Sequence, residues 1–123
     1  MATTQMTGKS FEEIVASNDI VLIDFWAAWC GPCRSFAPTY EKVAEKFPDF
    51  VFAKVDTEAE QSLASSFNIM SIPTLMIIRE SVVLYSQAGA LPERALVKLV
   101  EKVRDLDMQE VHRQMLEQQS ANS

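Results

Sequence analysis

The chain is expected to fold as an α/β protein with a mixed β-sheet that carries helices on both faces. Strand-like apolar runs alternate with helix-like segments, and then two strand-like runs, residues 74–78 and 82–86, follow each other across a short turn. Alternation builds parallel strands with crossover helices, whereas strands joined by a tight turn pair antiparallel. With 123 residues, 48% hydrophobic and 23% charged, the chain has the size and composition of one globular domain.

The N-terminal elements are short. Residues 1–7 are weakly patterned and can form an edge strand or stay loose. A short helix follows, with Phe11, Ile14 and Val15 on its buried side. Residues 20–26 are almost continuously apolar and rich in β-branched and aromatic side chains, which is typical of a strand covered on both faces.

The central and later elements follow the same logic. Residues 30–47 predict a helix with apolar side chains at helical spacing, and Pro38 is expected to kink it. Residues 50–56 predict a second central strand, and residues 58–67 predict a short third helix. The last helix is expected to open near Pro92. Its apolar side chains recur at helical spacing: Leu96, Leu99, Val100, Val103 and Leu106.

The C-terminal region differs from the rest, so we expect a domain over residues 1–106 and a polar extension over residues 107–123. Acidic residues and glutamines dominate the extension. A thin apolar stripe runs through it: Met108, Val111, Met115 and Leu116. The extension can continue the last helix, pack on the domain or pair with a second chain. A partly frayed polar tail is the favoured interpretation, because termini are usually loose.

Charge and termini restrict the partners and the location. The net charge of -6 argues against non-specific binding to nucleic acid or to anionic membranes. Residues 1–10 are polar and lack the apolar core of a secretory signal, and the strongest apolar run, residues 20–28, is too short to span a membrane. We therefore expect a cytoplasmic protein, in which a lone cysteine pair is more often catalytic than structural.

The chain has two cysteines, Cys30 and Cys33, and their spacing at the start of a helix is typical of a redox motif. The positive end of the helix dipole favours a thiolate at Cys30. Gly31 leaves that sulfur accessible, Pro32 suits the first helical turn, and Cys33 should be more buried. We interpret Cys30 as the attacking sulfur and Cys33 as the resolving one. The alternatives are two buried structural cysteines or a metal site, for which two cysteines supply only half of a tetrahedral shell.

Two further positions bear on this chemistry. Asp24 interrupts the first strong strand, and burial of a carboxylate raises its pKa into the range useful for proton transfer. Asp24 can then take the proton of Cys33, with Lys54 on the adjoining strand as its charged neighbour. Alternatively, Asp24 points to solvent or makes only structural hydrogen bonds. Pro73 stands where a strand begins, which is an allowed position, and the residues alone do not decide whether its peptide bond is cis.

These motifs, in this order and spacing, resemble the thioredoxin family over about residues 8–104. The resemblance is carried by Asp24–Arg34 with its Trp-Cys-Gly-Pro-Cys run, Pro38, Lys54–Asp56, Ile72–Thr74 and Gly89. It implies a thioredoxin fold, with a central mixed sheet of about four or five strands flanked by about four helices, to which this chain adds its C-terminal extension. The turn at residues 79–81 lacks the glycine usual in the family.

The resemblance also implies a function. Such a protein reduces protein disulfides by dithiol–disulfide exchange through Cys30 and Cys33, is recharged by an NADPH-dependent thioredoxin reductase, and carries no cofactor or metal. Asp24 would be the buried proton carrier with Lys54 beside it, and the Ile72–Pro73 bond would be cis. The implied substrate surface is flat and apolar: Trp29, Gly31, Pro32, Ile72, Pro73 and Gly89. The implied partners are disulfide-containing proteins, with no nucleic acid or membrane, and a monomer is expected.

Three alternatives remain open at this point. A thiol oxidant or isomerase is the nearest in mechanism, although the Gly-Pro dipeptide is typical of the reducing members. A thioredoxin-fold binding module, with redox turnover secondary, comes from another class, because a fold does not determine a function. Replacing both cysteines with serine distinguishes it, since binding survives and reduction does not. A dimer formed through the C-terminal stripe is the third alternative.

Overall fold

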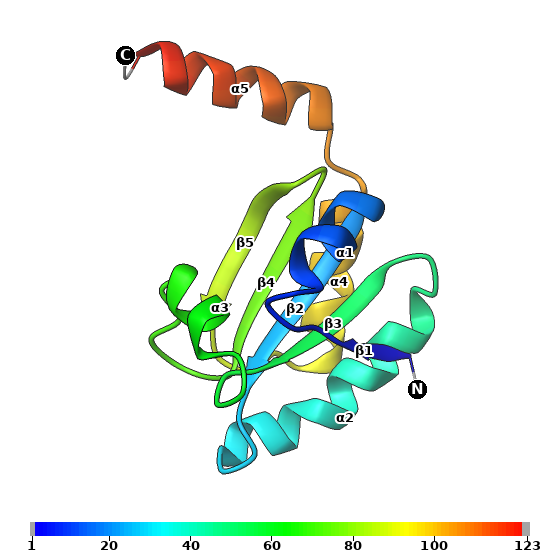
Figure 1. Cartoon of the computed structure of the whole chain (residues 1–123). Coiled ribbons are helices and arrows are strands. Elements are labelled where there is room, and N and C mark those ends of the chain that lie inside the picture. The colour runs from blue at the N-terminus through cyan, green and yellow to red at the C-terminus, as the bar shows by residue number, and fades with distance from the viewer. Residues whose placement is uncertain (1, 122–123) are drawn as a thin grey trace.

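The structure is a computed structural model that describes residues 2–121, and it has five strands and five helices. In chain order these are β1 (Thr3–Gln5), α1 (Phe11–Ser17), β2 (Ile20–Trp26), α2 (Gly31–Lys46), β3 (Val51–Asp56), α3 (Gln61–Ser66), β4 (Thr74–Arg79), β5 (Val82–Ala88), α4 (Glu93–Arg104) and α5 (Met108–Ala121) (Figure 1). The strands form one sheet in the order β1-β3-β2-β4-β5. β1 and β2 run parallel to β3, and β4 runs antiparallel to β2 and β5. The predicted mixed sheet is confirmed, with five strands.

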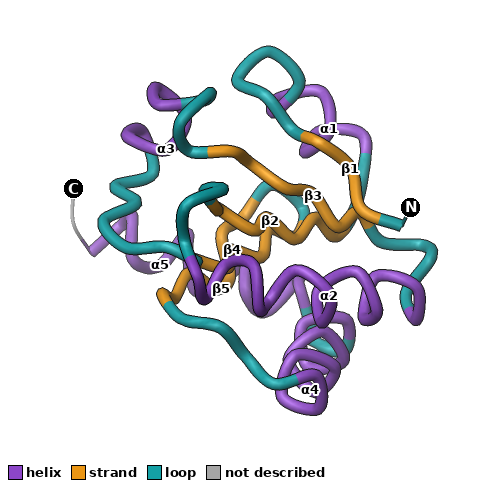
Figure 2. Tube along the Cα trace, turned by 90° about the horizontal axis from the view of Figure 1, so that it is seen from below, coloured by secondary structure: helices purple, strands orange, loops and turns teal. Residues whose placement is uncertain are grey.

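The sheet is covered on both faces, which explains the almost continuous apolar run of β2. Helices α1 and α3 lie on one face, and α2 and α4 lie on the other (Figure 2). Successive side chains of a strand point to opposite faces. Val21, Ile23 and Phe25 therefore pack in the core under α1 and α3. Ile20 and Leu22 pack in the core under α2 and α4.

The two ends of the central strands carry different structures. β2 leads from Trp26 into α2 at the end where Phe25 is paired with Thr74 of β4. At its other end Ile20 is paired with Arg79, next to the β4–β5 turn. Figure 1 shows the start of α2 at one end of the sheet and α5 at the opposite end. The cysteine pair is thus separated from the C-terminal extension by the length of the sheet.

Several predicted boundaries need correction. α3 begins at Gln61, three residues later than expected for a helix from Glu58, because Asp56 Oδ1 accepts the N–H of Glu58 at 2.9 Å and holds a turn there. α4 ends at Arg104, so Leu106 lies beyond the helix and is 38% exposed, whereas the helical spacing predicts it on the apolar stripe of the last helix.

The β4–β5 turn forms without the glycine that the family usually has at this position. Glu80 and Ser81 have φ angles of 51° and 63°. A two-residue hairpin turn of type I′ needs positive φ at both central positions. The turn therefore has the geometry that matches the twist of the strands, with two residues that adopt this backbone region only at a cost.

The C-terminal extension, for which a partly frayed tail is the favoured interpretation of the sequence, forms a helix, α5, in the structure. Asp107 Oδ1 accepts the N–H groups of Gln109 and Glu110, which caps the helix N-terminus. Arg113 forms ion pairs with Glu110 and with Glu117, one turn before it and one turn after it. Local capping and ion pairing therefore favour the helix. No helix in residues 2–121 is long and apolar enough to cross a membrane.

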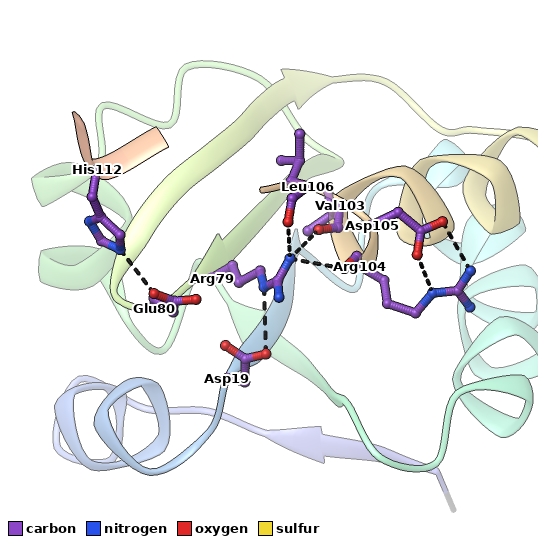
Figure 3. Close-up of polar contacts among 8 residues, drawn as sticks. All are labelled: Asp19, Arg79, Glu80, Val103, Arg104, Asp105, Leu106 and His112. Atoms are coloured by element: carbon purple, nitrogen blue, oxygen red, sulfur yellow. Dashed lines mark hydrogen bonds and ion pairs between the residues drawn. The ribbon is translucent and has the colours of Figure 1, made fainter. Parts of the chain in front are cut away.

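Two sets of contacts hold the end of α4 and the first turns of α5 against the sheet (Figure 3). Arg79 Nη1 donates to the carbonyls of Val103, Arg104 and Leu106 at 2.9, 2.9 and 3.1 Å, where α4 ends. His112 Nε2 lies 2.9 Å from Glu80 Oε1 on the β4–β5 turn. The guanidinium thus satisfies carbonyls that a helix end leaves without partners.

Candidate active site

Cys30 and Cys33 are joined by a disulfide at the start of α2, with their Cα atoms 5.2 Å apart. Cys30 is the N-cap of α2, and its Sγ accepts the N–H of Cys33 at 3.2 Å. An acceptor at this position satisfies one of the unpaired N–H groups of the first turn, and the helix dipole favours negative charge there. The sequence-based expectation that Cys30 lies at a helix N-terminus is confirmed.

The expected difference in burial between the two sulfurs is absent. Cys30 is 4% exposed and Cys33 is 3% exposed, so exposure does not distinguish the attacking sulfur from the resolving one. Both sit in a small apolar cluster with Ala27, against which Trp26 and Ile72 pack. What distinguishes the two is position, because only Cys30 is the N-cap residue that accepts a backbone N–H.

The dipeptide between the cysteines leaves the site open. A Cβ built on Gly31 would meet only Arg34 Nη2, at 4.0 Å, among the described residues. The interior of the chain therefore does not require glycine here, and the absent side chain leaves room for an outside partner. Pro32 is exposed in the first turn of α2, where its missing N–H costs no helix hydrogen bond.

The loop before β4 closes over the cysteines. The Ile72–Pro73 peptide bond is cis, as the resemblance implied. The carbonyl oxygen of Ile72 lies 3.8 Å from Cys30 Sγ. Gly89 donates its N–H to the carbonyl of Pro73 at 2.8 Å and has a φ of 110°, a backbone region that favours glycine. The fold thus brings Ile72 beside Cys30 and Gly89 beside Pro73, although Cys30, Ile72 and Gly89 are far apart in the sequence.

Trp29 forms the other side of this surface. Its ring is 67% exposed, and its Nε1 donates to Glu58 Oε1 at 2.6 Å. A hollow of about 200 Å³ lies between Trp29, Met70 and Ile72. The six residues of the expected substrate surface are not equally accessible: Trp29, Pro32 and Gly89 are exposed, Gly31 and Ile72 are half-buried, and Pro73 is buried.

Asp24 is a buried carboxylate, and the alternative that it points to solvent is wrong. It is 1% exposed, and neither of its side-chain oxygens has a hydrogen-bond partner among residues 2–121. Loss of hydration raises the pKa of Asp24 from 3.8 to about 7, while the positive charge of Lys54 acts to lower it. Asp24 and Lys54 are directly opposed in the β2–β3 pairing. The Lys54 ammonium lies 5.0 Å from the centroid of the Trp26 ring.

The sequence analysis missed three residues at this site. Glu58 is the hydrogen-bond acceptor of Trp29. Arg34 donates from Nη1 to the carbonyl of Ala28 at 2.7 Å, beside Gly31. Met70 lines the hollow and is 91% exposed. Only Met70 had a visible signal, because it is an apolar residue without a helical or strand pattern, two positions before Ile72.

A protein metal site has no support in the described part of the chain. No group of three or more His, Cys, Asp or Glu side chains among residues 2–121 is placed to hold a metal ion. The cysteines are bonded to each other rather than free to ligate.

Comparison with known proteins places the chain in context. The family model described as Thioredoxin matches residues 2–102. The Streptomyces coelicolor protein named "Putative thioredoxin 2" is 55% identical over 119 residues, covering 97% of this chain and 89% of that protein. Thioredoxin C-3 of Corynebacterium nephridii is 38% identical over 119 residues, covering 96% of this chain and 74% of that protein. Both alignments are long enough to extend into the C-terminal region.

The chain is also similar in structure to solved thioredoxins. Thioredoxin f from spinach chloroplast, in its short form, superposes with a TM-score of 0.77 at 33% identity, covering 84% of this chain and 94% of that one. A point mutant of thioredoxin from Halobacterium salinarum superposes with a TM-score of 0.79 at 33% identity, covering 85% and 93%.

Proposed function

The chain belongs to the thioredoxin family and is a thiol-disulfide oxidoreductase that reduces protein disulfides, and we propose a division of roles among its residues. Cys30 is the nucleophile, Cys33 resolves the intermediate, and Asp24 carries the proton, with Lys54 beside it. Trp29, Gly31, Pro32, Ile72, Pro73 and Gly89 receive the substrate. The observation that carries the proposal is the position of Cys30 as the N-cap of α2, next to the carbonyl of Ile72.

The reaction begins at the reduced pair. The Cys30 thiolate attacks one sulfur of the substrate disulfide, and the substrate S–S bond breaks as a mixed disulfide with Cys30 forms. The departing substrate sulfur takes up a proton. The backbone of the Ile72–Pro73 loop lies beside Cys30 Sγ, and Trp29 and Pro32 provide exposed apolar surface for the flanking substrate residues.

Resolution then needs a proton acceptor for Cys33. Asp24 accepts the Cys33 proton, and the Cys33 thiolate attacks Cys30 Sγ. The mixed disulfide breaks, and the second substrate sulfur leaves as a thiolate that takes up the proton held by Asp24. The substrate is then a dithiol, and Cys30 and Cys33 form the disulfide seen in the structure. Two electrons pass from the cysteine pair to the substrate. A pKa near 7 suits this step, because such a carboxyl both accepts and returns a proton near neutral pH.

The remaining partners follow from the family. An NADPH-dependent thioredoxin reductase returns two electrons to the Cys30–Cys33 disulfide, and the chain needs no resident cofactor. We place it in the cytoplasm as a monomer that acts on disulfide-containing proteins. Its net charge of -6 supports the proposal that neither nucleic acid nor an anionic membrane is a partner.

Insulin reduction coupled to NADPH oxidation by a thioredoxin reductase tests the roles of the sulfurs. Wild type is expected to turn over, and Cys30→Ser and Cys33→Ser are each expected to lose at least about 100-fold in rate. Cys33→Ser should accumulate a mixed disulfide with the substrate, whereas Cys30→Ser should not. Ser62→Ala, at an exposed position of α3, is the matched control and keeps the wild-type rate. Trapping by Cys30→Ser instead would reverse the assignment of nucleophile and resolver.

A further inference from the structure

Met70 stands out among the apolar side chains because it is 91% exposed. Met6, Met76 and Met108 are 1%, 2% and 6% exposed, and Met115 on α5 is 38% exposed. A soluble protein gains nothing in stability from a large apolar side chain held in water. The exposure of Met70 therefore needs a reason other than packing within the chain.

The surroundings of Met70 connect it to the cysteine pair. It lines the hollow of about 200 Å³ that Trp29 and Ile72 also line. Ile72 in turn packs on Cys30 and Cys33. A substrate chain whose disulfide reaches Cys30 passes over this hollow, so an apolar substrate side chain can enter it and contact the Met70 thioether. Methionine suits such a surface, because it is flexible and adapts to different partners.

We propose that Met70 is a peroxide-sensitive modification site through which oxidation lowers the affinity of the protein for its protein substrates. This inference rests on the proposed function, since the hollow matters only if a substrate lies across it. The thioether sulfur attacks one oxygen of hydrogen peroxide, the O–O bond breaks, and an S=O bond forms. The proton on the attacked oxygen goes to the departing hydroxide, which leaves as water, so the sulfur loses two electrons and the peroxide gains them.

The product changes the surface without changing the fold. Methionine sulfoxide is polar, so an apolar substrate side chain loses its contact and the sulfoxide oxygen must be dehydrated for binding. Because Met70 points into solvent, the core does not have to accommodate the added oxygen. The modification is reversible by methionine sulfoxide reductases, and the site can therefore act as a switch.

The oxidation itself is tested on the disulfide form of the full-length protein, in which both cysteines are protected from peroxide. Hydrogen peroxide is added, and peptide mapping by mass spectrometry follows the sulfoxide at each methionine with time. We expect Met70 to oxidise first and Met115 more slowly. We expect Met6, Met76 and Met108 to oxidise slowest. An oxidation rate at Met70 no greater than that at Met115 would overturn the proposal, whatever the protein does to its substrates.

The consequence is tested by kinetics after peroxide is removed and the cysteine pair is reduced. We expect KM for insulin to rise about fivefold, with kcat and the reduction of a small aromatic disulfide unchanged, because only the protein substrate reaches the hollow. Met70→Leu should have the same KM before and after peroxide, and Met70→Gln should show the raised KM without peroxide. Met115→Leu should remain as peroxide-sensitive as wild type.

The outcomes separate the two proposals. Absence of insulin turnover by untreated protein contradicts the proposed function, and with it the effect of oxidation on substrate affinity. The oxidation rate of Met70 relative to Met115 then still decides whether Met70 is the peroxide-sensitive site. Normal turnover with an unchanged KM after complete oxidation of Met70 contradicts this inference alone. A rise in KM of Met70→Leu after peroxide also contradicts this inference, because the group whose oxidation raises KM must then be another residue.

Discussion

The two ends of the sheet place polar groups in opposite situations. At the cysteine end, Asp24 is buried with both side-chain oxygens unpartnered among the described residues. At the other end, Arg79 donates to three carbonyls at the close of α4, and its Nε lies 3.5 Å from Asp19 Oδ2 (Figure 3). Both ends belong to the antiparallel pair of β2 and β4, in which Asp24 is paired with Leu75 and Ile20 is paired with Arg79. One end thus carries a buried carboxyl with no hydrogen-bond partner among the described residues. At the other end Arg79 Nη1 is hydrogen-bonded, and Arg79 Nε, which makes no hydrogen bond, lies within ion-pair distance of Asp19.

We infer that this difference in hydrogen bonding reflects the role proposed for each end of the sheet, proton transfer at Asp24 and a structural contact at Arg79. A group that gives and takes protons must have two protonation states of similar free energy, and burial without partners raises the pKa of Asp24 toward neutral pH. A group that holds elements together is most useful when it stays in one state with its hydrogen bonds made. The comparison therefore predicts that changes at the cysteine end can raise stability, whereas changes at the other end lower it.

The largest expected effect is at Asp24, and its sign depends on pH. The pKa of this carboxyl is about 7 in the folded protein and about 3.9 in an unfolded chain. Between these values the folded state holds a proton that the unfolded state has released, so stability falls as pH rises. Above pH 7 the accumulated loss is constant at about 4 kcal/mol, from about 1.4 kcal/mol for each pH unit. Asp24→Asn is therefore expected to raise the free energy of unfolding at pH 8.5 by up to that amount.

Urea denaturation of the oxidised protein at pH 4, 6 and 8.5 measures this dependence. The stabilisation by Asp24→Asn should be near zero at pH 4 and should grow with pH. If Asp24 is the proton acceptor that we propose for Cys33, the same variant slows insulin reduction. Asp49→Asn, at an exposed carboxylate in the turn after α2, is the control and should change stability by less than about 0.5 kcal/mol at every pH. A pH-independent gain at Asp24 would contradict the assigned titration.

The same contrast explains how much the sequence could predict. Strands over residues 20–26 and 74–78 were predictable because a run buried on both faces is apolar throughout. Asp24 was found for the same reason, as the one charge in such a run. The cis bond at Pro73 and the contact of Trp29 with Glu58 were not predictable from the residues alone, because both depend on tertiary structure.

The opposite end was predicted less well for a different physical reason. The order of α5 rests on local contacts that are individually weak, namely the cap at Asp107 and the ion pairs of Arg113. The capping aspartate is visible in the sequence, but the segment lies at a chain terminus, and termini are usually loose. The three-carbonyl contact of Arg79 joins residues more than twenty positions apart, so no local pattern signals it.

A loss of stability of intermediate size is expected at Arg79. Nη1 carries two hydrogens, which three carbonyls share, and Arg79→Met keeps the aliphatic stem but removes the donors. Leaving these helix-end carbonyls without their partner should lower the free energy of unfolding by about 2 kcal/mol. Insulin turnover should not change, because Arg79 lies at the end of the sheet opposite the cysteine pair. Lys98→Met, at an exposed position of α4, is the matched control with the same loss of charge. Reduced turnover in folded Arg79→Met would show that the two ends are coupled.

The smallest effect is expected from removal of α5. A chain of residues 1–106 keeps the three carbonyls of Arg79 but loses Met108, which is 6% exposed, and the contact of His112 with Glu80. The His112 and Glu80 side chains are 43% and 41% exposed, so solvent screens this pair and it contributes little. We expect a loss of about 1.5 kcal/mol, most of it from Met108, and an unchanged kcat/KM for insulin. Met108→Ala in the full chain should reproduce most of that loss.

Sedimentation of the full and shortened chains should give monomeric masses for both. A dimer that is lost on truncation would instead assign the exposed face of α5, with Leu116 at 64% exposure, to self-association.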